Sequence, residues 1–280
     1  MQTFESGGVQ PYPYRVTKGV ELSSRFWLVH AVLPALAFAV LLLAFQELPI
    51  DTYVARYWAY DATVNRWIGH GRWWADDLLH TDGRDAILLV IVGLLITIGR
   101  GLFSPRWSAA RGTAIYLLAT IALAWGFVGL LNHVTNVPCP WSLLGFGGER
   151  PHVGLFSPRP AGFGPAACFP GAHSASGFAL FAFYFAFRDR RPRRARRLLA
   201  IAILIGAIFA FGQEARGAHF LSHDVSSAFL AWFVALGTYR VWRHPAPRRR
   251  IALQEPRRIP RLERVPVDAQ QHLTRREFPR

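Results

Sequence analysis

Cysteine, lysine and acidic residues are all scarce in this sequence. Its 280 residues include two cysteines, and 17 acidic residues stand against 32 basic ones, which gives a formal net charge of +15. Lys18 is the only lysine, so arginine carries almost all of the positive charge. The chain has no internal repeat, no heptad pattern, no glycine-rich phosphate loop and no acidic metal-binding cluster. We therefore expect neither a repeat protein nor a P-loop enzyme, and we expect no metal or other cofactor.

The basic excess could indicate nucleic-acid binding, but no basic helix and no aromatic RNA-binding motif accompanies it. Hydrophobic residues make up 52% of the sequence and gather in long runs, while the charged residues lie between the runs. Such segregation is typical of membrane proteins. We expect contacts with membrane lipids and none with nucleic acid.

Six apolar stretches predict six membrane-spanning helices. Two of them reach the roughly 20 residues that cross a hydrocarbon core, and the others need flanking residues or snorkelling arginines to do so. We therefore predict an all-α, polytopic bundle of six transmembrane helices over residues 26–242. The six stretches are residues 26–45, 86–99, 112–131, 174–187, 198–213 and 225–239.

The loops between these stretches differ in charge. Residues 188–197 hold seven arginines against Asp189 alone, whereas residues 47–85 hold seven acids against four arginines. The positive-inside rule places the arginine-rich loops and both termini in the cytoplasm, which fits a bacterial inner-membrane protein. Residues 1–25 should form a cytosolic segment without a cleavable signal peptide, and residues 243–280 a basic, disordered cytosolic tail.

The first outer segment, residues 47–85, is rich in aromatic residues. The simplest interpretation is an aromatic belt at the membrane interface, where Trp and Tyr rings are favoured. The segment could also form a lid or a lipid gateway over the outer face. Its Tyr and Trp residues include Tyr53, Tyr57, Trp58, Tyr60, Trp67, Trp73 and Trp74.

The two cysteines, Cys139 and Cys168, lie in the same outer loop. In an oxidising compartment such a pair forms a disulfide more often than a metal site. Closing a loop of about thirty residues contributes roughly 3–4 kcal/mol in the chain-entropy model. We predict a Cys139–Cys168 disulfide that joins the two ends of this loop.

Three histidines and one arginine lie at the outer ends of the apolar stretches: His173, Arg216, His219 and His223. Each alone would be read as an interfacial anchor or a snorkelling side chain. His219 and His223 are four residues apart and would share one face of a helix, which Arg216 joins if the helix begins early enough. A guanidinium binds phosphate oxygens, while imidazoles act as nucleophile and acid near neutral pH. The group is therefore suited to phosphoryl transfer.

The segments around these residues resemble the type 2 phosphatidic acid phosphatase superfamily, whose integral-membrane branch has six helices. Phe169-Pro-Gly-Ala-His173 is similar to its second motif, Pro-Ser-Gly-His, and residues 216–224 are similar to its third, Ser-Arg-x5-His-x3-Asp. The first motif, Lys-x6-Arg-Pro, would fall at residues 132–140. Cys139-Pro-Trp141 and Ala218-His-Phe-Leu-Ser-His223 further resemble a divergent bacterial branch.

The resemblance implies a role for each residue. His219 takes the place of the nucleophile that becomes phosphorylated, and His173 that of the general acid that protonates the leaving oxygen. His223 takes the place of the aspartate that orients the nucleophile, with Asp224 as a second candidate for that task. Arg216 is the candidate for binding the phosphate.

Several positions depart from the superfamily pattern. Asn132 and Cys139 stand where the first motif has Lys and Arg, Gly171 replaces Ser, and Gln213 stands where the third motif has Arg. These changes remove cationic phosphate ligands. Other groups could compensate as phosphate ligands, namely Asn132, a backbone nest at Gly171, the Ser174 hydroxyl and Arg150.

The implied function is hydrolysis of a lipid phosphate or diphosphate at the periplasmic face through a phosphohistidine intermediate. Candidate substrates are phosphatidic acid, phosphatidylglycerophosphate, a polyprenyl diphosphate and the phosphates of lipid A. A lipid phosphotransferase and a catalytically inactive lipid-binding relative are alternatives. A further alternative is a membrane haem protein, whose axial ligands would come from His30, His133, His173 and His219.

Overall fold

The computed structural model describes residues 22–155, 157–158 and 161–243. All of them belong to one compact unit that ends at His244. The sequence predictions for the cytosolic N-terminal segment and the basic tail fall outside the described residues, apart from residues 22–25 and Arg243.

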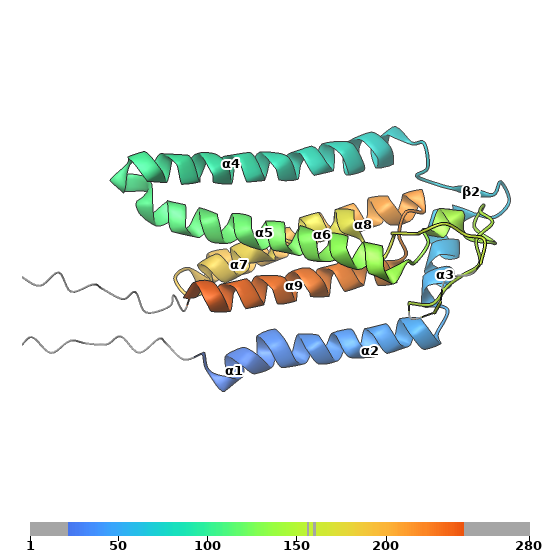
Figure 1. Ribbon diagram of the computed structural model, residues 1–280, viewed down its shortest axis with the longest axis horizontal. Coiled ribbons are helices and arrows are strands. Elements are labelled where there is room, and N and C mark those ends of the chain that lie inside the picture. The colour runs from blue at the N-terminus through green and yellow to red at the C-terminus, as the bar shows by residue number, and fades with distance from the viewer. Residues whose placement is uncertain (1–21, 156, 159–160, 244–280) are drawn as a thin grey trace, which may run out of the picture. The chain divides into compact units, whose positions relative to one another are not determined.

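Long helices dominate the described part of the chain (Figure 1). α1 (Ser24–Trp27), the π-helix η1 (Leu28–Val32) and α2 (Leu33–Glu47) follow one another directly, as do the π-helix η3 (Trp74–Asp82) and α4 (Gly83–Phe103). A 3-10 turn, η4 (Pro105–Trp107), leads into α5 (Ser108–Thr135). Further along the chain come α6 (Ala172–Phe178), α7 (Phe181–Phe187), α8 (Pro192–Arg216) and α9 (Leu221–Arg243).

Every apolar stretch predicted from the sequence is helical, apart from a break at residues 179–180 between α6 and α7, so the helical fold class is confirmed. Among the described residues, four helical segments are long and apolar enough to cross a membrane: Ser24–Glu47, Trp74–Phe103, Pro105–Ser142 and Pro192–Arg216. The apolar helix Ala172–Phe187 is shorter, and α9 carries polar residues in its first two turns. Six membrane crossings therefore stay a prediction.

The outward faces of the long helices are apolar. On α2, Leu36, Val40 and Leu43 are each about 60% exposed, and no residue of that helix is buried. Leu89 on α4 is 72% exposed and Leu204 on α8 is 59% exposed. A soluble monomer rarely exposes so much contiguous apolar surface. These faces are suited to contact with lipid acyl chains.

Small residues bring α6 and α8 close together. A Cβ atom at Gly177 of α6 would lie 2.8 Å from the Cα atom of Gly206 on α8. The absence of both side chains lets the two backbones approach, as in many membrane helix pairs. Because the helices run antiparallel, the beginning of α6 lies beside the end of α8. This packing places His173 near Arg216.

The end of the bundle where α2 ends has its own small aromatic core. α3 (Ile50–Val54), η2 (Ala55–Ala59) and the two-residue strands β1 (Tyr60–Asp61) and β2 (Arg66–Trp67) build it. Tyr60 and Trp67 are buried there with Phe146 and Phe220, whereas Tyr53, Tyr57 and Trp73 are exposed. Residues 74–85, the last part of the predicted outer segment, are helical and continue into α4.

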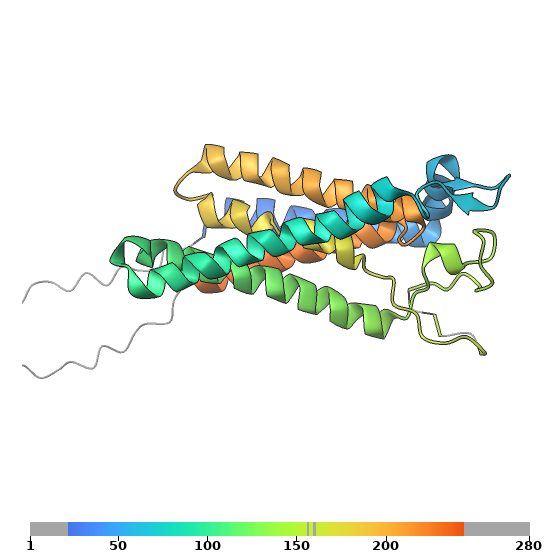
Figure 2. The same cartoon turned by 90° about the horizontal axis from the view of Figure 1, so that it is seen from above.

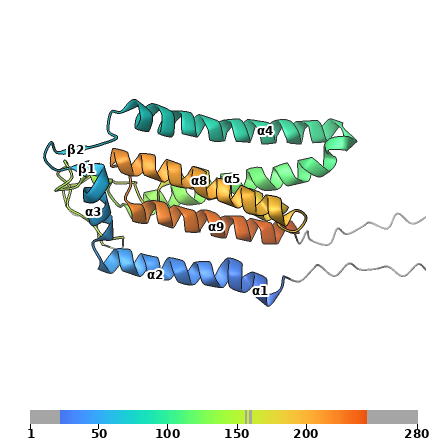
Figure 3. The ribbon, with the colours of Figure 1, turned by 180° about the vertical axis from the view of Figure 1, so that it is seen from behind.

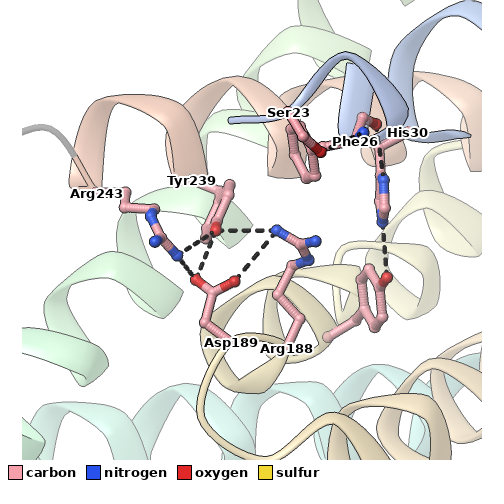
Figure 4. Close-up of polar contacts among 8 residues, drawn as sticks. Ser23, Phe26, His30, Arg188, Asp189, Tyr239 and Arg243 are labelled. Atoms are coloured by element: carbon pink, nitrogen blue, oxygen red, sulfur yellow. Dashed lines mark hydrogen bonds and ion pairs between the residues drawn. The ribbon is translucent and has the colours of Figure 1, made fainter. Parts of the chain in front are cut away.

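A polar cluster joins the turn after α7 to α9 at the opposite end (Figure 4). Asp189 forms ion pairs with Arg188 and Arg243 and accepts a hydrogen bond of 2.6 Å from the hydroxyl group of Tyr239. The Arg188 guanidinium lies over the ring of Phe26, 4.4 Å from its centre. The cluster therefore ties the first helix to the arginine-rich turn.

His30 in η1 lies beside this cluster, and both of its ring nitrogens are occupied. Nδ1 lies 2.9 Å from the carbonyl oxygen of Phe26, and Nε2 lies 2.7 Å from the hydroxyl oxygen of Tyr184. An axial haem ligand needs a free ring nitrogen. The geometry of His30 argues against the haem-protein alternative.

The orientation of the bundle can be tested with reporters. The turn between α7 and α8 and the α3–hairpin segment lie at opposite ends in every view (Figures 2 and 3). We expect a reporter fused after Arg194 to behave as cytosolic and one fused near Gly148 as periplasmic, because the arginine-rich end should stay inside. The reverse result at both sites would contradict the proposed orientation.

Candidate active site

His219 lies in the short connection between α8 and α9. Gly217 ends α8 with φ +77°, and its N–H bonds to the carbonyls of Gln213 and Glu214. Only glycine adopts this left-handed conformation without strain, and a Cβ there would also meet the Trp67 ring. α9 begins at Leu221, so His219 is not on a helix. The predicted helix face shared by His219, His223 and Arg216 is therefore wrong.

The ring of His219 is held by the backbone of the outer loop. Its Nδ1 lies 2.7 Å from the carbonyl oxygen of Cys168. Because a carbonyl oxygen only accepts, Nδ1 carries the proton and Nε2 keeps a free lone pair. Cys168 is joined to Cys139 by a disulfide, with 5.1 Å between their Cα atoms, and its N–H donates to Val137. The disulfide loop thus fixes the position of this carbonyl.

The environment of His219 keeps it neutral. The pKa of His219 is lowered to about 4, mainly by burial, and His173, Arg216 and His80 act in the same direction with smaller effects. The hydrogen bond to the Cys168 carbonyl acts in the opposite direction. At neutral pH the imidazole is therefore uncharged, which is the form required of a nucleophile.

His173 is the second residue of α6 and lies within electrostatic range of His219. Its Nε2 donates to the carbonyl oxygen of Leu79 at 2.9 Å. Its ring lies against Phe209 on one side, with 4.5 Å between ring centres, and 4.9 Å from the ring centre of His80. No other described protein group hydrogen-bonds to this ring, so Nδ1 remains available for proton transfer.

Arg216 ends α8 and is held by two side chains. Its Nε atom forms an ion pair with Asp76, and Nη1 donates to Oε1 of Gln213 at 3.3 Å. Gln213 is only 3% exposed, yet its Nε2 has no hydrogen-bond partner among the described residues. A buried donor without a partner is costly and therefore calls for an acceptor that a ligand could supply.

Asp76 and His80 of η3 belong to this group, although the motifs did not reveal them. η3 packs on α8, where Leu79 approaches Gly212 and Phe209 approaches Gly83. The π-helical stretch widens the helix at this point, a feature often found at functional sites. The only signal in the sequence is the four-residue spacing of Asp76, His80 and Arg84.

Comparison with known families covers the part of the chain that contains these histidines. Residues 113–245 match the family model described as the PAP2 superfamily. This part of the chain belongs to the PAP2 superfamily. The resemblance inferred from the motifs is confirmed, and membership indicates a membrane phosphatase type of function. The match does not include η3.

Two further comparisons gave no match. A search of curated proteins finds no match to the chain, and a search of solved structures finds none either.

His223 does not hold the position expected of the orienting residue in the PAP2 superfamily. Its ring centre lies 5.7 Å from that of His219, but no hydrogen bond joins the two rings in the described structure. The ring is 3% exposed and its edge contacts Phe169 and Phe220. His223 instead lines a cavity of about 100 Å³. The Cys168 carbonyl, and not His223, orients the ring of His219.

Four other candidates form a buried network that joins α6 to α9. The Ser174 hydroxyl donates to Oδ1 of Asp224 at 2.5 Å, and the N–H of Gly171 donates to the His223 carbonyl at 3.2 Å. The side-chain amide of Asn132 donates to the Pro170 carbonyl at 2.6 Å. Ser174, Asp224 and Gly171 are buried. These groups position His173 and are not free to bind phosphate.

Arg150 is also engaged away from the histidines. Its Nη1 donates to the Gly164 carbonyl at 2.9 Å, and its guanidinium lies 5.7 Å from the ring centre of Phe163. Both partners belong to the same outer loop. The structure therefore gives Arg150 a role in folding this loop and does not bring it to the site.

The buried network can be tested at Gly171. A Cβ atom there would lie 2.7 Å from the Ser174 hydroxyl and would collide with the Asp224 carboxylate. We expect Gly171→Ala to lower the free energy of unfolding by about 1–3 kcal/mol through overpacking. The measurement is the thermal unfolding midpoint in detergent.

Gly112→Ala in α5 is the matched control, because a Cβ there meets nothing within 4 Å. This substitution should be neutral or stabilise the helix by roughly 0.5–1 kcal/mol. Equal midpoints for the Gly171 variant and the control would contradict the tight packing around Gly171.

Proposed function

We propose that this protein is a lipid phosphatase of the inner membrane, with His219 as its nucleophile at the periplasmic face. The substrate would be a lipid phosphate or diphosphate, hydrolysed through a phosphohistidine. One observation carries the proposal. The hydrogen bond from Nδ1 to the Cys168 carbonyl leaves Nε2 of a neutral His219 free, close to His173 and Arg216.

The phosphate would be bound at the end of α8. Arg216 offers a guanidinium that is only partly used by Asp76 and Gln213. The unpartnered amide Nε2 of Gln213 adds a buried donor at the position where the superfamily motif has an arginine. Charge-assisted and amide hydrogen bonds together would hold the non-bridging oxygens while the phosphorus faces His219.

In the first step, Nε2 of His219 attacks phosphorus and the P–O bond to the lipid breaks. The bonding electrons pass to the leaving oxygen. His173 in its protonated form delivers the proton from Nδ1, because its Nε2–H stays bonded to the Leu79 carbonyl. Burial lowers the pKa of His173 to about 4, and the hydrogen bond to the Leu79 carbonyl acts in the opposite direction and orients the ring. The negative charge of a bound phosphate would favour the protonated form.

In the second step, water attacks the phosphohistidine. The P–N bond breaks, its electrons return to Nε2 of His219, and His173 takes the proton of the attacking water through Nδ1. Inorganic phosphate leaves, and both histidines regain their initial states. The cycle requires only side chains of this chain and water.

The surroundings of the site support a lipid substrate. The histidines lie at the outer end of helices whose outward faces are apolar, so a lipid phosphate in the outer leaflet could approach without leaving the membrane. The charge distribution of the loops favours the periplasm as the compartment of this end.

Single substitutions should separate the roles of the histidines. We expect His219→Ala to abolish both turnover and an acid-labile phosphoenzyme. His173→Ala should slow turnover by roughly 10²–10⁴-fold but still form phosphoenzyme from a substrate with an activated leaving group. The measurements are phosphate release from a panel of lipid phosphates in detergent without divalent metal, and trapping of labelled phosphate on the protein.

His223→Ala should retain activity within about tenfold, because His223 makes no hydrogen bond to His219 in the described structure and acts through packing. His70→Ala, which changes an exposed histidine of the outer segment, is the control and should be unaffected. Phosphoenzyme formed by His219→Ala would refute the assignment of the nucleophile.

A further inference from the structure

The connection between α8 and α9 carries His219 and is held by groups from outside these two helices. The last carbonyl groups of a helix have no partner within the helix. At the end of α8, the carbonyl oxygen of Ala215 accepts a hydrogen bond of 2.9 Å from the N–H of Gly69, which belongs to the outer segment. The carbonyl oxygen of Gly217 accepts one of the same length from the N–H of Trp141. The end of α8 is therefore fixed by groups that lie far away in the sequence.

The beginning of α9 is held by Asp51 of α3. The N–H of Ser222 is among the first four of α9, and such groups have no acceptor within the helix. It donates to Oδ1 of Asp51 at 2.9 Å, and the Ser222 hydroxyl donates to Oδ2 of the same side chain. A carboxylate at a helix N-terminus also interacts favourably with the helix dipole. Asp51 thus caps α9 from another element of the fold.

Two glycines let the outer segment pack closely on the connection. A Cβ atom at Gly69 would lie 2.9 Å from both the carbonyl carbon and the Cβ atom of Ala215. A Cβ atom at Gly217 would collide with the ring of Trp67. Trp67 is itself buried and donates from Nε1 to the carbonyl oxygen of Phe146 at 3.2 Å. The two chain segments therefore fit together without space for an added methyl group.

His219 lies against this part of the outer segment. Together with Asp51, Ala55 and Trp67, it lines one small crevice at the end of the bundle where α8 ends (Figures 1 and 3). Rings in an aromatic belt would point toward the lipid head groups, whereas Tyr60 and Trp67 are buried. A lid would have to break the hydrogen bonds to the connection in order to open. These contacts make the segment a fixed wall of the site.

We propose that Asp51 and Gly69 clamp the α8–α9 connection and act as positioning residues for the nucleophile His219. This inference rests on the proposed function, and both residues lie outside residues 113–245, which match the superfamily. Gly69 fixes the end of α8 and Asp51 fixes the start of α9, so the chain between them has one position. Nucleophilic attack needs this precision, because a displacement of about 1 Å can cost about 100-fold in rate.

The two contacts of the clamp should affect different kinetic constants. Arg216, which would bind the phosphate, is adjacent to Ala215 on α8, whereas Asp51 acts on α9. Loss of Asp51 should displace His219 and leave phosphate binding intact. A side chain at Gly69 should push Ala215 aside and move Arg216 with it. Phosphate binding should then weaken as well.

The test measures hydrolysis of phosphatidic acid in detergent. Asp51→Ala should lower kcat by about 10–100-fold while KM stays within about threefold of wild type. Asp51→Asn keeps an oxygen that can accept the Ser222 N–H, so it should retain kcat within about fivefold. Gly69→Ala should lower kcat and also raise KM. Wild-type kcat in Asp51→Ala would overturn the clamp.

Two further variants make the comparison specific. Ser222→Ala removes one of the two hydrogen bonds to Asp51 and should have a kcat between those of Asp51→Ala and wild type. It also tests the clamp if Asp51→Ala fails to fold, because a wild-type kcat in Ser222→Ala would then overturn it. An equal loss in Asp51→Ala and Asp51→Asn would overturn the clamp too, since charge and not hydrogen bonding would then be decisive.

Asp61→Ala is the matched control. The Asp61 side chain also accepts hydrogen bonds from one N–H and one hydroxyl group, but both donors belong to Thr63 within the same hairpin. The substitution therefore removes the same kind of interaction without touching the α8–α9 connection. Both kcat and KM should stay at the wild-type values.

A measurement on the histidine ring separates failure of the clamp from failure of the proposed function. In protein labelled with ¹⁵N-histidine, the Nδ1 proton of His219 should exchange slowly with water, because it is bonded to the Cys168 carbonyl. Exchange should become about tenfold faster in Asp51→Ala and stay unchanged in Asp61→Ala. If no lipid phosphate is hydrolysed but this difference is observed, the proposed phosphatase fails while the clamp stands. Equal exchange rates in the two variants overturn the clamp.

Discussion

The hydrogen bond from Nδ1 of His219 to the carbonyl oxygen of Cys168 is the interaction on which the site depends. It joins the α8–α9 connection to the outer loop, and the Cys139–Cys168 disulfide anchors that loop. Since His219 is buried, losing this acceptor would leave a polar group unpaired at a cost of about 1–3 kcal/mol. The same hydrogen bond selects the tautomer of His219 that is protonated on Nδ1. One contact therefore both stabilises the fold and leaves Nε2 able to react.

The rest of the bundle brings other groups to this fixed ring. Close packing of α6 on α8 at Gly177 and Gly206 places His173 beside the end of α8. Gly217 stops α8 there and turns the chain toward His219. η3 then adds Asp76 and His80 from outside the segment that matches the superfamily. Polar groups thus gather at one end of helices whose outer faces remain apolar.

The sequence was sufficient to predict the features that depend on composition and on local motifs. Apolar runs located the long helices, and the motifs around His173 and His219 identified the superfamily. The sequence was insufficient where a backbone atom holds a side chain in place, because any residue has a carbonyl group and the one of Cys168 cannot be recognised from its residue type. The prediction of a helix face shared by Arg216, His219 and His223 was wrong because Gly217 ends α8 before His219. His80 was missed because η3 lies outside the superfamily motifs and its residues belong to the segment that the sequence analysis interpreted as an aromatic belt.

The central claim is that the Cys168 carbonyl holds the Nδ1 proton of His219 and leaves Nε2 to react. The most direct measurement is to trap the phosphoenzyme with labelled substrate, map the modified residue and identify the phosphorylated ring nitrogen by NMR. We predict phosphate on Nε2 of His219, since Nδ1 is committed to the carbonyl. Phosphate on Nδ1 of His219, or on His223, would contradict this claim.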